Sequence, residues 1–119
     1  MILVDTSVWI DHLRSGDQEL VHLLLTTQVL IHPFIVGELA CGNLSNRSVV
    51  LKLLADLPQV ETATDMETLF FIEQHQLMGR GIGYVDAHLL ASTYLGSAIK
   101  IWTRDRRLTL LAAELDKSY

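Results

Sequence analysis

The chain has 119 residues, of which 50% are hydrophobic, and it carries a net charge of −5 and a single cysteine. This length predicts one small domain with a packed core, and the lone Cys41 excludes an internal disulfide and fits a reducing compartment. No stretch approaches the roughly twenty apolar residues of a membrane span, and the N-terminus lacks the features of a signal peptide, so we expect a cytoplasmic protein.

The first third of the chain predicts two strands, each followed by a helix. The apolar run Ile2–Asp5 is typical of a central strand covered on both faces, and Thr6–Leu13 follows it as a helix. Asp17 can cap the next helix. Val29–His32 predicts a second strand, and Pro33 suits the first turn of the helix after it.

The middle of the chain predicts two more helices around a short strand. Asn46–Asp56 is expected to be helical, and Gln59–Thr62 can form an edge strand. Thr64 and Glu67 have the spacing of a capping box, which predicts a helix running to about Met78.

The last third repeats the order of strand and helix. A glycine-rich loop, Gly79–Gly83, leads into a helix that carries Asp86. Ala98–Trp102 predicts another strand, and Arg106–Leu115 predicts a terminal helix. Strands that alternate with helices require crossover connections, so we expect a three-layer α/β domain. Its mostly parallel sheet would have four or five strands flanked by helices, with the first strand near the centre.

An acidic residue recurs at successive strand-to-helix units along the chain. Asp5 ends the first strand, Glu38 lies on the helix after the second, Asp86 opens a helix, and Asp105 follows the last strand. Because the carboxyl ends of parallel strands share one crevice, we expect the four carboxylates to meet there. They would repel one another strongly unless divalent cations bound them. The pattern predicts a metal site for phosphate-ester chemistry.

Each of these acids also has a purely structural interpretation. Asp5, Asp86 and Asp105 could each do no more than cap the helix that follows, and Glu38 could point outward from among small residues. Glu38 fits that interpretation least well, because its helix is otherwise almost entirely apolar and a carboxylate on an apolar face is costly to desolvate.

The segments that contain these acids resemble the motifs of the PIN domain and, within that family, of the VapC-type toxins of bacterial toxin–antitoxin systems. The segments are Val4–Asp11, Val36–Leu39, Gly83–Ala91 and Trp102–Asp105. They come in the family's order and together cover essentially the whole chain. The opening Asp-Thr-Ser-Val-Trp is the most specific of them.

The resemblance implies a single PIN-like nuclease domain over residues 1–119 that acts as a metal-dependent endoribonuclease. It also implies a homodimer and inhibition by a cognate antitoxin protein. The catalytic and metal-binding residues that it assigns are Asp5, Glu38, Asp86 and Asp105, with Thr6 and Thr103 as auxiliary candidates.

The implied cofactor is Mg²⁺ or Mn²⁺, which carboxylate oxygens and water suit as ligands. A metal-bound water would attack the phosphate and leave a 5′-phosphate and a 3′-hydroxyl, and a second ion roughly 4 Å away would stabilise the leaving oxygen. Some relatives carry a further acid where this chain has Arg106 and Arg107. We therefore expect a second metal position to be weak, or filled only when substrate phosphate adds ligands.

The net charge argues against a nucleic-acid partner, but most of the basic residues lie close in sequence to Asp86 and Asp105. A metal-filled acidic centre with a basic rim can still hold a polyanion. The candidates for RNA contact are Arg80, Arg104, Arg106 and Arg107, although any one of them can equally be a solvated surface charge.

Two other functions remain open from the residues alone. The acidic pocket could belong to a non-catalytic module that binds a basic segment of a partner. A phosphatase with Asp5 as nucleophile is disfavoured, because haloacid-dehalogenase enzymes need a second Asp two residues later, where this chain has Ser7. The residues also do not separate RNA from single-stranded DNA as the substrate.

Overall fold

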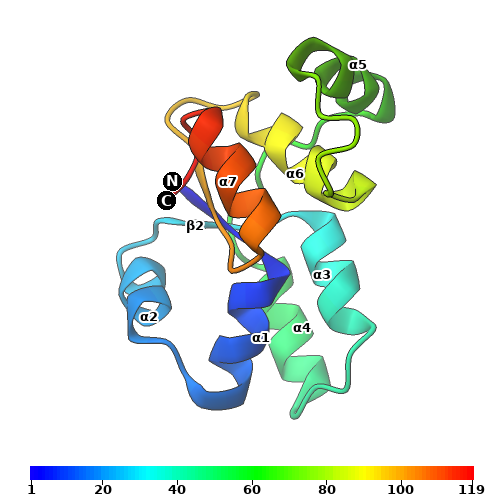
Figure 1. Ribbon diagram of the computed structural model, residues 1–119. Coiled ribbons are helices and arrows are strands. Elements are labelled where there is room, and N and C mark those ends of the chain that lie inside the picture. The colour runs from blue at the N-terminus through cyan, green and yellow to red at the C-terminus, as the bar shows by residue number, and fades with distance from the viewer.

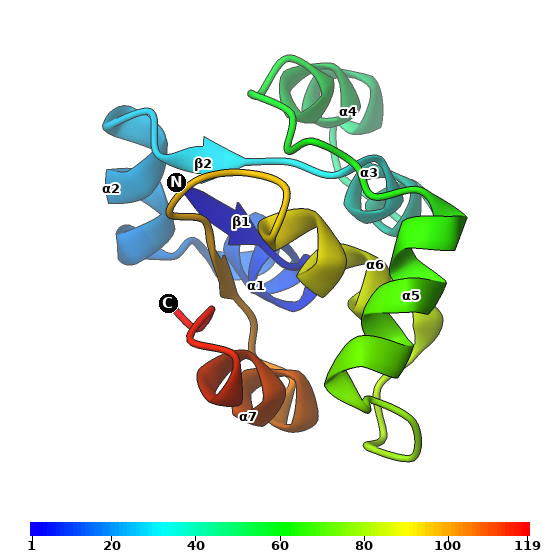
Figure 2. The same cartoon turned by 90° about the horizontal axis from the view of Figure 1, so that it is seen from above.

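The computed structural model, which describes residues 1–119, has a parallel sheet with helices on both faces (Figure 1, Figure 2). The strands are β1 (Ile2–Val4), β2 (Val29–Leu30) and β3 (Lys100–Trp102). The helices are α1 (Thr6–Ser15), α2 (Gln18–Leu25), α3 (Pro33–Ala40), α4 (Arg47–Ala55), α5 (Asp65–His75), α6 (Tyr84–Thr93) and α7 (Arg106–Glu114). Helices α1 and α6 cover opposite faces of the sheet, and α5 packs outside α6 (Figure 2). The predicted three-layer α/β fold is confirmed.

The sheet has the order β2-β1-β3, so the first strand lies in the centre as predicted. Both neighbours run parallel to β1, with Leu3 paired to Leu30 on one side and to Ile101 on the other. All three residues of β1 are buried, which explains why this strand is uniformly apolar.

The sheet is narrower than the four or five strands expected, because its outer members are single bridges. Ile31 pairs with Gln59 beyond β2, and Ile101 pairs with Ser118 beyond β3, both in parallel. The predicted edge strand after Pro58 is limited to this pairing, in which Val60 donates to Ile31. The chain then leaves the sheet to begin α5.

The helix starts follow the capping signals in the sequence. The Thr64 hydroxyl accepts from the backbone of Glu67 at 3.0 Å, and the Glu67 carboxylate accepts from the backbone of Thr64 at 2.9 Å, which confirms the predicted capping box of α5. Asp17 caps α2 by accepting from Leu20 at 3.0 Å, also as predicted. Helix α5 ends before Met78, because Gln76 adopts a left-handed conformation with φ of 53°. None of the helices combines the length and apolar character needed to cross a bilayer.

Candidate active site

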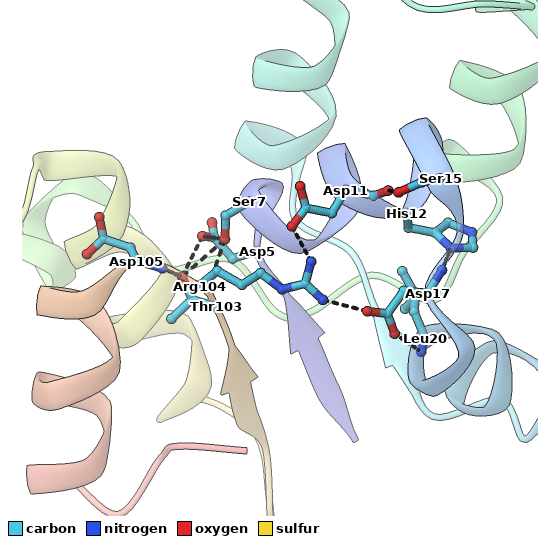
Figure 3. A network of polar contacts seen from close by, with 10 residues as sticks. All are labelled: Asp5, Ser7, Asp11, His12, Ser15, Asp17, Leu20, Thr103, Arg104 and Asp105. Carbon is cyan, nitrogen blue, oxygen red and sulfur yellow. Dashed lines mark hydrogen bonds and ion pairs between the residues drawn. The ribbon is translucent and has the colours of Figure 1, made fainter.

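The site lies where β1 and β3 end and the helices that follow them begin. The parallel register places Val4 beside Trp102, and the next residue, Asp5, donates its backbone N–H to the Trp102 carbonyl at 2.9 Å. The side chains of Asp5 and Thr103 therefore leave the sheet at the same edge (Figure 3). This edge is the crevice that the sequence predicts for the acids.

Asp5 is a buried carboxylate with only 7% of its surface exposed, and two hydroxyl groups hold it. Its Oδ2 accepts from the Thr103 hydroxyl at 2.7 Å and from the Ser7 hydroxyl at 2.9 Å. Its side chain makes no capping bond to α1, so the structural interpretation of this residue as a helix cap is wrong. No lysine, arginine or histidine forms an ion pair with it. A buried carboxylate in such surroundings is a strong candidate for binding a cation from solution.

The two hydroxyls are in turn fixed by the backbone that follows β3. Thr103 Oγ1 accepts from the backbone N–H of Asp105 at 3.0 Å, and Ser7 Oγ accepts from that of Arg104 at 3.0 Å. Each hydroxyl thus accepts one bond and donates its single proton to Asp5. The orientation of the Asp5 carboxylate is set by the β3–α7 connection.

Asp105 both caps a helix and faces the site. Its Oδ1 accepts from the backbone of Leu108 at 2.9 Å, so the capping interpretation is correct for this oxygen. Its Oδ2 has no hydrogen bond to the protein. Figure 3 shows the Asp105 carboxylate on the side of Asp5 away from the Arg104 guanidinium. The residue therefore remains available to a ligand through one oxygen.

Asp86 is half-buried at the start of α6, where its Oδ2 accepts from the backbone of Gly83 at 3.3 Å. Burial raises the pKa of its carboxyl, and the charges of Asp5, Asp105 and Glu38 raise it further. The bond from Gly83 acts in the opposite direction. The four acids therefore share one electrostatic field even though they come from four separate segments of the chain.

Glu38 lies on α3 and is exposed, so the argument that burial would be costly there does not apply. Its Oε1 accepts from the Thr6 hydroxyl at 2.7 Å, which ties α3 to the start of α1. Both auxiliary threonines thus contact an acid, since Thr6 bonds to Glu38 and Thr103 bonds to Asp5. Their predicted role as auxiliary site residues stays a prediction.

The four acids share a pattern that suits a divalent cation. Each carboxylate accepts from the protein through one oxygen and leaves the other without a protein donor. No three His, Cys, Asp or Glu side chains converge closely enough to hold an ion between them alone. The structure therefore does not confirm that the four carboxylates meet, but Mg²⁺ is usually bound through one or two carboxylates and keeps several of its waters, so it does not require all four. Hard, anionic oxygens without a protein cation are suitable donors for such an ion.

Ser7 is a functional candidate that the sequence analysis missed. It stands two residues after Asp5, and its hydroxyl joins that carboxylate to the β3–α7 connection. A hydroxyl in the first helical turn after an acid that ends a strand was the available signal.

Two of the four arginines predicted to contact RNA already form ion pairs within the protein. Arg104 forms ion pairs with Asp11 and Asp17 (Figure 3), so an RNA contact by its guanidinium would have to break both. Arg80 pairs with Glu114 at 2.8 Å. Arg106 and Arg107 form no ion pair, although Arg107 lies against the backbone of the loop before α6. These two are the more available members of the predicted basic rim.

Comparison with known proteins places the chain in a family. The family model described as "PIN domain" matches residues 2–114. Two curated relatives, both named "Ribonuclease VapC32", come from Mycobacterium tuberculosis strains CDC 1551 / Oshkosh and ATCC 25618 / H37Rv. Each is 49% identical over 114 residues, which cover 96% of this chain and 92% of the relative.

Proposed function

The chain belongs to the PIN-domain family and is similar to VapC ribonucleases, and on that basis we propose that it is a metal-dependent endoribonuclease with a single nuclease domain. We also propose that it is the toxin of a toxin–antitoxin pair. The observation that carries the proposal is the buried Asp5 carboxylate, which has hydroxyl partners but no protein cation and lies in the field of the other acids. The proposed catalytic and metal-binding residues are Asp5, Glu38, Asp86 and Asp105.

A bound Mg²⁺ or Mn²⁺ would supply an activated water and charge stabilisation at the scissile phosphate. Thr103 and Ser7 fix the carboxylate of Asp5 before substrate arrives, so the site loses little freedom on binding. Asp105 keeps one oxygen for the site while its other oxygen anchors α7. Attack by water leaves a 5′-phosphate and a 3′-hydroxyl, without use of the ribose 2′-hydroxyl.

The histidines of this region support a mechanism without an imidazole base. His32 is fully buried and its Nδ1 accepts from the backbone of Phe34 at 2.9 Å, while burial lowers the pKa of its imidazole to about 4. His88 is also buried and lies within hydrogen-bonding distance of Thr68 and Asp65. Neither ring is free to take a proton from a substrate or water in the crevice. His88 thus has a packing role in the core.

The direct test is cleavage of labelled transfer RNA and ribosomal RNA by the purified, antitoxin-free protein. Reactions with Mg²⁺, with Mn²⁺ and with EDTA would run beside the Asp5→Asn variant, which controls for contaminating nuclease. Discrete cuts that need the metal and disappear in the variant are expected. Cuts that persist in the variant would refute the mechanism. A folded, metal-binding protein that cuts no RNA would instead favour the non-catalytic module for a basic partner segment.

A groove beside Glu38 is a candidate binding site for the proposed antitoxin. A cavity of about 630 Å³ between α1, α3 and α4 has a mixed lining, in which five apolar residues lie beside Glu38, Arg14 and small polar residues. Its apolar lining residues are Ile10, Leu13, Leu39, Leu44 and Val50. We propose that an apolar antitoxin segment lies here and points a basic residue at Glu38. Leu13→Asp is then expected to keep RNA cleavage but escape inhibition by the co-expressed antitoxin, and continued inhibition of this variant would contradict the placement.

We also propose that the chain forms a homodimer. Helix α5 exposes Met66, Leu69 and Phe70 with 81%, 57% and 67% of their surfaces accessible, which is unusual for a face that stays in water. Light scattering of the purified chain tests this, and a monomer at high concentration would refute it.

A further inference from the structure

Two aromatic side chains are exposed beside the acids and rest on one buried histidine. Phe34 and Tyr84 have 38% and 45% of their surfaces exposed, whereas His88 has only 2%. The ring centroids of Phe34 and Tyr84 lie 4.8 Å and 4.7 Å from that of His88, with interplanar angles of 70° and 84°. Both rings therefore pack on the same buried histidine although they come from α3 and α6.

This pair of rings is held rigidly in place. The Tyr84 hydroxyl donates to Asp65 Oδ1 at 2.9 Å, and the same oxygen lies 2.9 Å from Nε2 of His88. The other ring nitrogen of His88 lies 3.1 Å from the Thr68 hydroxyl. Phe34 packs in addition against the buried ring of His32, with centroids 5.0 Å apart. Exposed rings that are fixed in this way lose little side-chain entropy when a flat ligand stacks on them.

The helices that carry these rings also carry two of the proposed catalytic acids. Phe34 stands one helical turn before Glu38 on α3, a spacing that places side chains on the same face of a helix. Tyr84 begins α6, whose first turn contains Asp86. A base resting on these rings would therefore be attached to a phosphate near the acidic crevice.

We propose that Phe34 and Tyr84 form a stacking platform for an unpaired nucleobase next to the scissile phosphate, a subsite that rests on the proposed ribonuclease function. Aromatic rings stack with every base, so the platform favours unpaired RNA over duplex without reading its sequence. In a duplex, neighbouring bases already cover the faces that the rings would contact. The platform thus limits the substrate to loops, bulges or single strands.

The test measures binding of a fluorescein-labelled single-stranded RNA to the non-cleaving Asp5→Asn protein by fluorescence anisotropy. Added to this background, Phe34→Leu or Tyr84→Leu is expected to weaken binding roughly ten- to hundred-fold, the effect of losing one stacked base. Tyr84→Phe keeps the ring and is expected to bind nearly as well as the background. Tyr94→Leu is the matched control, because Tyr94 is a comparably exposed tyrosine at the opposite end of α6 from Tyr84.

A second RNA with one abasic residue, moved in turn through the sequence, separates stacking from a change in fold. The leucine variants should bind one of these abasic RNAs as well as the background does, because the stacked base is already missing. Thermal unfolding confirms that each variant is folded, and Phe34→Tyr provides a ring-keeping substitute at the more buried position. Leucine variants that bind intact RNA like the background, or no more weakly than Tyr94→Leu, would overturn the platform, as would a background that binds no RNA.

The same experiment separates this proposal from the ribonuclease proposal. Weaker binding by the leucine variants supports the platform even where the unmutated protein fails to cleave, because the assay does not depend on cleavage. Normal cleavage together with unaffected binding would reject the platform alone.

Discussion

Two groups of carboxylates lie side by side in this protein, and only one of them has a protein cation. Asp11 and Asp17 share the guanidinium of Arg104 (Figure 3). The Asp5 carboxylate, in contrast, accepts hydrogen bonds only from the hydroxyls of Ser7 and Thr103. Arg104, in the β3–α7 connection, links the two groups. Its side chain pairs with Asp11 and Asp17, and its backbone N–H donates to the Ser7 hydroxyl. The protein supplies the first group with a cation of its own, whereas it orients Asp5 with hydroxyls and gives it no cation.

One acid in each group has a shifted pKa, and the two shifts have opposite directions. The pKa of Asp17 is lowered, first by the backbone N–H of Leu20 and then by Arg104. The pKa of Asp86 is raised by burial and by the neighbouring acids. Asp17 therefore stabilises the fold in its ionised form, whereas Asp86 costs stability when it is ionised. A bound divalent cation would remove that cost.

The largest expected effect comes from changing one carboxylate to an amide in each group. Asp5→Asn should lower metal-dependent RNA cleavage by about a hundred-fold or more, since several kcal/mol of transition-state stabilisation depend on the metal. Asp11→Asn makes the same chemical change in the Arg104 group and should leave the cleavage rate nearly unaltered. Initial cleavage rates of both variants are measured on one labelled RNA. An equal loss of rate in the two variants would contradict the distinction between the groups.

The next effect concerns the hydroxyl that orients Asp5. Thr103→Val keeps the shape of the side chain but removes the bond to Asp5 Oδ2 and the acceptor for the Asp105 N–H. Loss of such an orienting partner typically lowers metal affinity or activity about ten- to hundred-fold. The apparent affinity for Mn²⁺ in cleavage assays should weaken accordingly, and Thr103→Ser should restore it. A valine variant with unchanged metal dependence would argue that Ser7 alone orients Asp5.

A smaller effect is expected from removing the internal cation. Arg104→Met leaves Asp11 and Asp17 without their partner and should lower the free energy of unfolding by about 1 kcal/mol, the scale of partly exposed ion pairs. Urea unfolding measures this loss, which should shrink at high salt because screening weakens the pairs. A variant as stable as the parent protein would show that the pairs do not stabilise the fold.

The smallest effect is the opposite response of the two groups to acid. Because the folded pKa of Asp17 is lowered, its contribution to stability is present above its unfolded value of 3.8 and is lost as pH falls through the folded pKa. Because the folded pKa of Asp86 is raised, its charge costs stability at neutral pH, and that cost disappears as the pH falls through this pKa. Urea unfolding in EDTA should therefore find Asp86→Asn more stable than the parent at neutral pH and Asp17→Asn less stable. Both differences should fade on acidification, and a destabilised Asp86→Asn protein at neutral pH would contradict this account.

The sequence predicts the parts of the molecule that follow from local signals. The apolar run of β1, the capping box of Thr64 and the cap at Asp17 each depend on a few neighbouring residues, and each is confirmed. Three of the acids could be found because they follow strands and parallel strands end at one edge, whereas Asp86 opens a helix that comes after a loop. The width of the sheet was less predictable, because the outer pairings at Gln59 and Ser118 depend on tertiary contacts rather than on residue type.

The partners of the charged side chains could not be read from the sequence. Arg104 meets Asp11 and Asp17 across more than eighty positions of chain, so no local pattern reveals that its charge is already used. The exposure of Glu38 is a similar case, because burial on a short helix depends on which neighbours cover it. The contact of Ser7 with Asp5 could have been predicted, since the order Asp-Thr-Ser places a hydroxyl two residues after the acid.

The central claim is that the crevice carboxylates take a cation from solution whereas the Arg104 group does not. Calorimetric titration of Mn²⁺ into the unmutated protein, Asp5→Asn and Asp11→Asn tests it without depending on any RNA. The account predicts that the unmutated protein and Asp11→Asn bind the ion equally well and that Asp5→Asn binds it much more weakly. Equal binding by all three proteins, or no binding by the unmutated protein, would contradict it.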